Sequence, residues 1–408
     1  MIESLICENN KLAQSSIDGI GNLVPRSVSK RGLAEAASRR RDGTSWAWPE
    51  REDLSFEFTR LLGAAQDGGS TVAECLAAAD AIDIFDDWSW YREWKRLGDT
   101  NQKRGNAALS AGNTITARSN WLRAVNYYLA AIFPFEIANE NQRAALQSMR
   151  RCALDYLRYR KTPGEVVSIP WPAAYSLEGY FLPAAQGGAN RSAKPAPTVI
   201  CIGEPGQRKE KYLYKHTRHA CERGLSLLVV DLLGSGGSNA FEKIRLPELE
   251  SAIRHIMDHL VERRDVDKRR IAILADGWGS SFVARGIASD ERFAAAVCDG
   301  GIWDLHERAF FRDRVARLGA DVGCAAASSN VARNIRCPVL IPAGERGWLK
   351  ADRVKDLYSQ LKAEGQDVTL KIFTSEETAA IHAHADNPTL ANEFIFDWIA
   401  ARLGSKAH

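Results

Sequence analysis

The sequence lacks the features that would bring the chain to a membrane or to nucleic acid. No apolar run approaches the ~18 residues of a membrane span, and the N-terminus, with Glu3 and Glu8, has no long apolar core of a secretory signal. The formal net charge is only +3 over 408 residues. The tight basic run Arg39-Arg40-Arg41 has no interleaved aromatic residues. The sequence therefore predicts neither a membrane nor a nucleic-acid partner.

Residues that would pair as disulfides or as zinc ligands are also missing. None of the eight cysteines has a partner at C-x-x-C spacing, and Cys201, Cys298 and Cys337 fall in or beside predicted buried strands, where a thiol packs as a small apolar group. Scattered cysteines in so long a chain indicate reduced thiols and a cytoplasmic location. His382-Ala383-His384 is too closely spaced for a helical ligand pair. We expect neither a metal nor another cofactor.

Three stretches of different character divide the chain, which is too long for one typical compact core. Residues 1–50 are polar with little periodicity, which predicts a flexible N-terminal arm. Residues 51–160 repeat apolar residues at helical spacing and predict a helical domain. The tryptophans at 88–94 are expected to pack in its core or against the next domain, because aromatic side chains dominate burial. Residues 161–408 form the third stretch.

In this third stretch, short apolar runs alternate with helical segments. The predicted strands are 166–170, 177–181, 198–202, 225–231, 270–274, 293–298, 338–343 and 368–373. The first two are expected to pair antiparallel, and helices such as 246–263 and 352–364 separate the others. Apolar strands separated by helices indicate an α/β fold with a mostly parallel sheet flanked by helices on both faces. Ligands bind such sheets at the carboxyl ends of the strands.

The most informative motif is a nucleophile elbow that has no nucleophile. A predicted strand at 270–274 leads into Ala275-Asp276-Gly277-Trp278-Gly279-Ser280, and a helix follows from Ser281. Strand, tight turn and helix are the setting of the G-x-S-x-G motif, whose cramped turn needs small residues two before and two after the nucleophile. Ala275 and Gly279 satisfy this requirement only if residue 277 is the nucleophile, and residue 277 is glycine.

Other registers of the motif fit less well. Asp276 as nucleophile would put Leu274 and Trp278 at the small positions, and Ser280 would put Trp278 and Phe282 there. The plain alternative is an ordinary strand–helix turn whose glycines give the backbone its freedom.

With these elements in order, the chain resembles an α/β-hydrolase family with an N-terminal helical cap. The family includes the 2,6-dihydroxypseudooxynicotine hydrolase, fungal naphthopyrone chain-shortening hydrolases and fermentation–respiration switch proteins. The resemblance covers about residues 52–402. It rests on the tyrosine-rich segment 122–128, the aspartate–glycine loop 231–238, the elbow lead-in 266–272 and the histidine loop 379–382 with its following helix. It implies an α/β-hydrolase fold, a small-molecule substrate, a homodimer and a role in secondary metabolism.

The departures from the family pattern fall on the catalytic positions. The elbow serine corresponds to Gly277, and the acid after the next-to-last strand corresponds to Gly347. The oxyanion loop, usually Gly-Gly, reads Gly203-Glu204-Pro205-Gly206. His382 is the triad member that remains, and His384 is expected to be a bystander.

The residues that remain predict chemistry without a covalent intermediate. Glycine has no atom to form an acyl-enzyme. His382 is left as a general base, and the backbone N–H groups of Trp278 and Glu204 could stabilise an oxyanion. These groups suit C–C lysis, dehydration, isomerisation or cyclisation of a polyketide-like or aromatic ketone, or direct activation of water. We therefore interpret the chain as an acid–base enzyme of this superfamily.

Several residues are candidates to support His382 or the substrate. Glu345, Asp304 and Glu204 are the carboxylates nearest to the expected site. The predicted substrate contacts are Asp276 and the cap residues Trp88, Tyr127 and Tyr128. For each carboxylate, a surface or capping role is at least as good an interpretation. Two other interpretations of the whole chain stay open: a non-catalytic binding protein that kept the fold, and a serine C–C hydrolase carrying a Ser→Gly change.

Overall fold

The computed structural model describes residues 48–135, 140–171, 176–184, 194–203, 207–232, 246–277, 279–303, 331–347 and 349–405, with the side chains of 246–250 left aside. None of the helices in these ranges combines the length and apolar character that crossing a bilayer requires.

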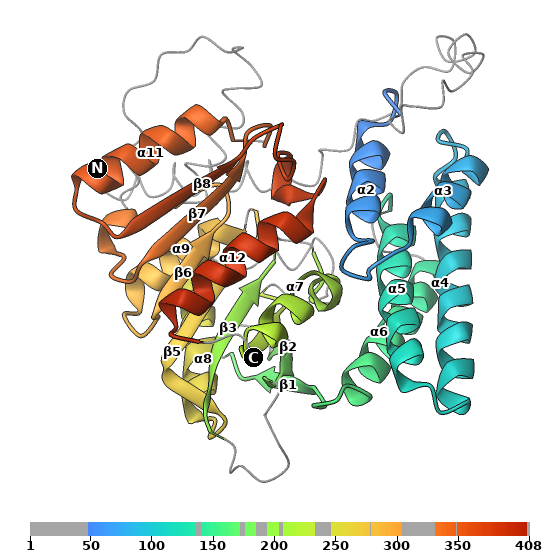
Figure 1. Ribbon diagram of the computed structural model, residues 1–408, viewed down its shortest axis with the longest axis horizontal. Helices are drawn as coiled ribbons and strands as arrows, with labels where there is room; N and C mark the ends of the chain where they lie inside the picture. The colour runs from blue at the N-terminus through green and yellow to red at the C-terminus, as the bar shows by residue number, and fades with distance from the viewer. Residues whose placement is uncertain are drawn as a thin grey trace, which may run out of the picture.

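The predicted α/β fold is confirmed by one eight-stranded sheet (Figure 1). Its strands are β1 (Glu165–Ile169), β2 (Leu177–Leu182), β3 (Ala196–Ile202), β4 (Ser226–Val230), β5 (Val266–Ala275), β6 (Ala295–Cys298), β7 (Val339–Gly344) and β8 (Val368–Phe373). They lie in the order β1-β2-β4-β3-β5-β6-β7-β8. The pairs β1–β2 and β2–β4 are antiparallel, and every later pair is parallel.

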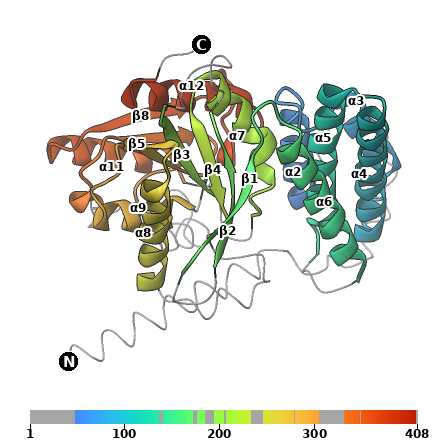
Figure 2. The ribbon, with the colours of Figure 1, turned by 90° about the horizontal axis from the view of Figure 1, so that it is seen from below.

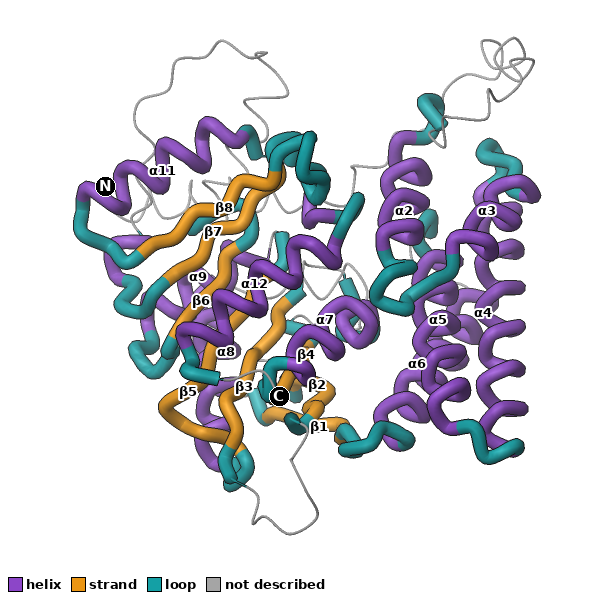
Figure 3. Tube along the Cα trace, in the orientation of Figure 1, coloured by secondary structure: helices purple, strands orange, loops and turns teal. Residues whose placement is uncertain are grey.

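Helices cover both faces of this sheet (Figures 2 and 3). On one face lie α8 (Leu246–Glu262), α9 (Gly279–Ser289) and α11 (Ala351–Ala363), and on the other lie α7 (Lys211–Glu222) and α12 (Pro388–Arg402). Strand residues alternate between the two faces: Ile200 and Ile202 pack toward α8 and α9, whereas Val199 and Cys201 pack toward α7 and α12. Because helices cover both faces, residues on either side of a strand are buried, and the strands are therefore continuous apolar runs in the sequence.

Before the sheet, the described chain is entirely helical. Its helices are α2 (Glu52–Gly63), α3 (Val72–Ala81), α4 (Asp87–Ser110), α5 (Thr114–Ile132) and α6 (Glu140–Arg158). Thr71 caps α3 by accepting a bond from the Glu74 N–H, as N-cap residues do. Glycines let the long helices approach closely, since a Cβ on Gly98 would lie 2.7 Å from the Tyr128 ring. Trp90 and Trp94 are fully buried, as the sequence predicted.

The helical unit docks on the core beside α7 and the histidine loop (Figures 1 and 2). The Arg60 guanidinium of α2 donates to the Tyr214 hydroxyl of α7 at 2.7 Å. Asp67, which follows α2, accepts from Arg218 at 2.8 Å and from Thr389 at 2.8 Å, and lies 3.1 Å from the His219 ring. A Cβ on Gly63 would lie 2.5 Å from the Ala385 carbonyl oxygen. The two units are therefore in intimate contact at the histidine loop.

Candidate functional site

The turn between β5 and α9 has the backbone of a nucleophile elbow. Gly277 lies at its tip with a left-handed φ of 48°, as the strained position of an elbow requires. A Cβ on Gly279 would come within 2.7 Å of the Gly203 carbonyl oxygen, which explains the small residue at that place. Ser280 is fully buried and donates its hydroxyl to the carbonyls of Gly277 and Asp299. The geometry thus agrees with the register that places residue 277 at the tip.

Beside the tip, the Asp276 carboxylate forms a buried ion pair with α7. Both of its oxygens lie 2.9 Å from the Lys215 ammonium, and the Tyr212 hydroxyl donates to it at 3.1 Å. Burial alone would raise the pKa of Asp276, but the Lys215 and Lys211 ammonium groups hold that pKa well below its usual range. The carboxylate predicted to bind substrate is therefore bound to Lys215.

On the other side of the tip lies a carboxylate that the sequence reasoning missed. Asp299 directly follows β6, and its Oδ2 accepts the Gly277 N–H at 3.1 Å. Its Oδ1 lies 3.5 Å from Nε2 of His384. Burial tends to raise the pKa of Asp299, and the His384 ring outweighs this and lowers it. The sequence signal was present, because Asp299 stands at the carboxyl end of a predicted parallel strand, where ligands bind.

His384 is buried and turned toward the elbow, so the structure does not leave it as a bystander. Nδ1 lies 2.7 Å from the Ala379 carbonyl oxygen and therefore carries the proton of that bond. Burial tends to lower the pKa of His384, but the Asp299 carboxylate reverses this and raises it. The spacing of the sequence could not distinguish His384 from His382, because loop geometry decides which ring turns inward.

The loop that carries both histidines is strained. Among the described residues, non-glycine residues with positive φ occur only here: Thr378 at 70°, Ala379 at 57°, Ala383 at 52° and His384 at 56°. The Asp386 carboxylate holds the loop by accepting the N–H groups of Ala380 and Ile381. Strained backbone persists only where its surroundings fix it, and it concentrates at functional sites.

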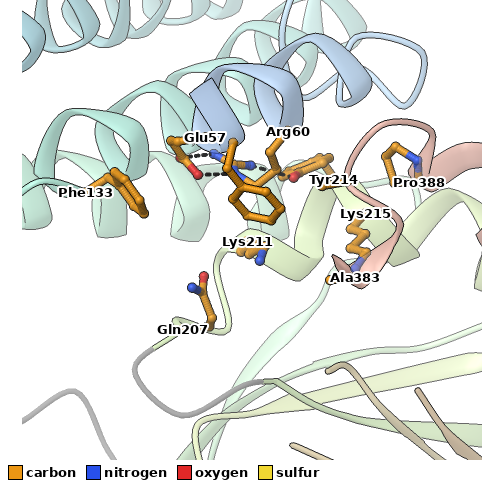
Figure 4. A pocket seen from close by; sticks show the side chains of 11 residues that line it. Glu57, Arg60, Phe133, Gln207, Lys211, Tyr214, Lys215, Ala383 and Pro388 are labelled. Carbon is orange, nitrogen blue, oxygen red and sulfur yellow. Dashed lines mark hydrogen bonds and ion pairs between the residues drawn. The ribbon is translucent and has the colours of Figure 1, made fainter. Parts of the chain in front are cut away.

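A pocket opens between the helical unit, α7 and this loop (Figure 4). The empty space between its walls is about 480 Å³, a volume that includes the open solvent at its mouth. Its walls are formed by Phe56, Glu57, Arg60, Phe133, Gln207, Lys211, Tyr214, Lys215, Ala383, Ala385 and Pro388. His382 is not one of these wall residues, but its ring lies 6.3 Å, centre to centre, from the ring of Phe56, which is. Lys215 both lines the pocket and pairs with Asp276. The pocket is thus next to the residues that flank Gly277.

The cap aromatics predicted to contact substrate are placed elsewhere. Tyr127 and Tyr128 are fully buried inside the helical unit, and their hydroxyls donate to Glu74 at 2.8 Å and to Asp99 at 2.8 Å. Helical periodicity predicted the buried face correctly, but it does not show which partner covers that face. Trp88 is 40% exposed and packs against Tyr91 and Phe135.

The acid loop after β7 does not supply a buried carboxylate. Glu345 is exposed and accepts from the N–H and hydroxyl of Ser375 at 2.7 and 2.8 Å. A Cβ on Gly347 would lie 3.1 Å from the Gly344 carbonyl oxygen, so the loop packs tightly at this glycine. Glu204, Trp278 and Asp304 lie outside the described residues. Within the described ranges, no cluster of three or more side chains could hold a metal ion.

Comparisons with known proteins show the family to which the chain belongs. A family model described as "Esterase FrsA-like" matches residues 77–325. The hydrolyase poxO of Penicillium oxalicum is 27% identical over 326 residues, which cover 76% of this chain and 70% of poxO. The α/β hydrolase gkaG of Penicillium citrinum is 31% identical over 271 residues, or 64% of this chain and 62% of gkaG.

Two solved structures share the fold over most of the chain. The 2,6-dihydroxy-pseudo-oxynicotine hydrolase superposes with a TM-score of 0.63 at 17% identity, covering 84% of this chain and 97% of that protein. AbyA5 superposes with a TM-score of 0.59 at 18% identity, covering 87% of this chain and 95% of AbyA5.

Proposed function

The chain belongs to the FrsA-like esterase family of the α/β-hydrolase superfamily, and we propose that it catalyses acid–base chemistry without a covalent acyl-enzyme. The observation that carries this proposal is Gly277, a glycine with left-handed backbone at the turn between β5 and α9, where the hydrolase motif has its nucleophile. Acyl transfer through this position needs a nucleophilic side chain, and glycine has none. The surrounding base and cationic groups can still assist reactions that pass through an enolate or an alkoxide.

In this proposal His382, whose ring lies 6.3 Å from the ring of the pocket residue Phe56, is the general base. It removes a proton from a substrate hydroxyl or from the carbon next to a carbonyl group. The negative charge then moves to the carbonyl oxygen as an enolate, or stays on the alkoxide that expels a carbon fragment. Lys211 lines the same pocket, and its positive charge favours this developing anion. C–C lysis, dehydration, isomerisation and cyclisation all follow this pattern, and direct water activation uses the same base.

The proposed substrate is a small aromatic or polyketide-like ketone. Phe56 and Phe133 give the pocket two aromatic walls beside its cationic groups, as suits a flat molecule that becomes anionic. One structural relative is named for 2,6-dihydroxy-pseudo-oxynicotine. We further propose that residues 51–160 act as the cap, that the chain works as a cytoplasmic homodimer in secondary metabolism, and that it needs no cofactor.

The test is turnover of a panel of aryl 1,3-diketones and 2,6-dihydroxypseudooxynicotine, followed by loss of substrate absorbance. We expect turnover without an initial burst and without labelling of the elbow by a fluorophosphonate probe. His382→Ala should lower kcat by roughly 10²–10⁴-fold, the usual contribution of a general base. His255→Ala, on the far face of the sheet, is the matched control and should retain full activity.

Two results would reject this proposal. An acyl adduct trapped on the protein and found by mass spectrometry would show covalent catalysis. Tight binding of panel members with no conversion of any of them would favour the non-catalytic interpretation.

A further inference from the structure

Two buried charged side chains meet under the elbow and have no role in the proposed reaction. Asp299 comes from the end of β6 and His384 from the strained loop; only 7% and 4% of their surfaces are exposed. Asp299 contacts the Gly277 N–H through Oδ2 and His384 through Oδ1. A single carboxylate thus joins the tip of the elbow to the histidine loop.

The orientation of the His384 ring shows which of its two nitrogens makes the contact with Asp299. Nδ1 is bonded to the Ala379 carbonyl, so Nε2 is the nitrogen that faces the elbow. In a serine hydrolase, the nitrogen that faces the elbow bonds the nucleophilic hydroxyl, and the acid holds the other nitrogen. Here the nitrogen facing the elbow faces Asp299. We propose that the Asp299 carboxylate has taken the place of the absent serine hydroxyl as the elbow-side partner of His384.

The surroundings of the pair support a charged contact. Two other charged groups near it, Asp276 and Lys215, already neutralise each other, and His382 lies on the same loop as His384. A buried carboxylate needs hydrogen bonds or an opposite charge. Asp299 obtains the first from Gly277, and it obtains the second from His384 when that ring carries a proton on each nitrogen. His384 has no hydrogen bond at Nε2 other than this ion-pair contact within the described residues.

The consequence is a positioning role for Asp299. His384 and Ala383 both have left-handed backbone, and the loop needs a fixed anchor to keep that conformation. Asp299 anchors it to the elbow, and the same loop carries His382 two residues away and contributes Ala383 to the wall of the pocket. Asp299 therefore acts through the loop and touches no reacting atom.

The proposal makes a specific prediction for a restored serine. In Gly277→Ser, His384 Nε2 remains occupied by Asp299, so a fluorophosphonate probe should label the protein at least tenfold more slowly than it labels Gly277→Ser/Asp299→Ala. Labelling of the double variant should be lost on adding His384→Ala and retained on adding His255→Ala, the control in α8 on the far face of the sheet. Rapid labelling of Gly277→Ser alone, or a folded double variant that is not labelled, would overturn the proposal.

A second measurement applies even where the double variant fails to fold. Histidine side-chain NMR follows the titration of His384 in the wild-type chain and in Asp299→Asn, which keeps the shape of the side chain. We expect the His384 titration to move to lower pH in the variant, because the Asp299 carboxylate raises the pKa of His384. An unchanged His384 titration would overturn the proposal. Neither experiment depends on the substrate, so this proposal can fail while the proposed function stands.

Discussion

Two buried ion pairs lie beside Gly277, and they differ in whether a change of pH can neutralise one of their partners. Asp276 is held by Lys215, an ammonium whose pKa is raised further by that carboxylate although burial opposes the rise. Asp299 is held by His384, an imidazole that can lose its proton within a few pH units of neutrality. The lowered pKa of Asp276 and the raised pKa of Lys215 keep the first pair charged on both sides of neutral pH. The second is the one that pH can alter, so only one side of the elbow is sensitive to pH.

The largest expected effect comes from breaking the permanent pair. Lys215→Met leaves the Asp276 carboxylate buried without its counter-charge, and we expect a loss of about 3–5 kcal/mol in the free energy of unfolding. Urea denaturation measures this loss. Lys215→Met/Asp276→Leu is the matched control and should lose clearly less, because it leaves no lone charge. Equal losses in the two variants would mean that the pair contributes by packing alone.

The sequence predicted the elbow that these two pairs flank, but it did not predict the partners in the pairs. The strands and the elbow followed from local patterns: apolar runs marked each strand, and the small residues Ala275 and Gly279 fixed the register around Gly277. The partner of Asp276 did not follow, because Lys215 lies 61 residues earlier along the chain. Long-range pairing depends on how helices pack on the sheet, and periodicity gives only the buried face of each helix.

The histidine loop shows the same limit. Its position before the last helix was predictable, but its left-handed residues were not, since Thr378 and Ala379 are not residues that favour positive φ. Those dihedral angles decide that His384 turns inward. Asp299 was overlooked because the family pattern directed attention to two other carboxylates, Glu345 and Asp304.

The second effect concerns the titratable pair and depends on pH. The folded-state pKa of His384 is raised, so its contribution is complete below the unfolded pKa of about 6.5 and is lost as pH rises through the folded value. At about pH 6, His384→Gln should cost about 1.5–3 kcal/mol, the range for hydrogen bonds to charged groups. The cost should shrink toward alkaline pH.

This measurement requires the difference between wild type and variant at each pH. His216 is buried with a pKa well below its usual range, because burial disfavours its charged form. It therefore gives the wild-type curve a slope of opposite sign, with stability rising through the unfolded pKa of histidine. Urea denaturation of wild type, His384→Gln and Lys215→Met from about pH 5.5 to 9 separates the pairs. A His384→Gln cost that stays constant over this range would contradict the assignment of the charged pair.

The smallest effect is expected at the acid loop. Glu345 is exposed and is bonded to Ser375, so its carboxylate gains little from its surroundings. Glu345→Gln should leave the thermal unfolding midpoint within experimental error of wild type. A large fall in the midpoint would show that this loop contributes to the elbow region in spite of its exposure.

Asp67 has a consequence for how a ligand reaches the pocket. Its carboxylate is completely shielded from solvent and is held at once by α7, through Arg218 and His219, and by α12, through Thr389. Lifting the helical unit away from the sheet would break all three contacts and leave a desolvated charge. These contacts therefore oppose any hinge movement of the helical unit relative to the sheet. A ligand would then reach the pocket through its open side, and Phe56 and Phe133 are among the side chains that line the pocket.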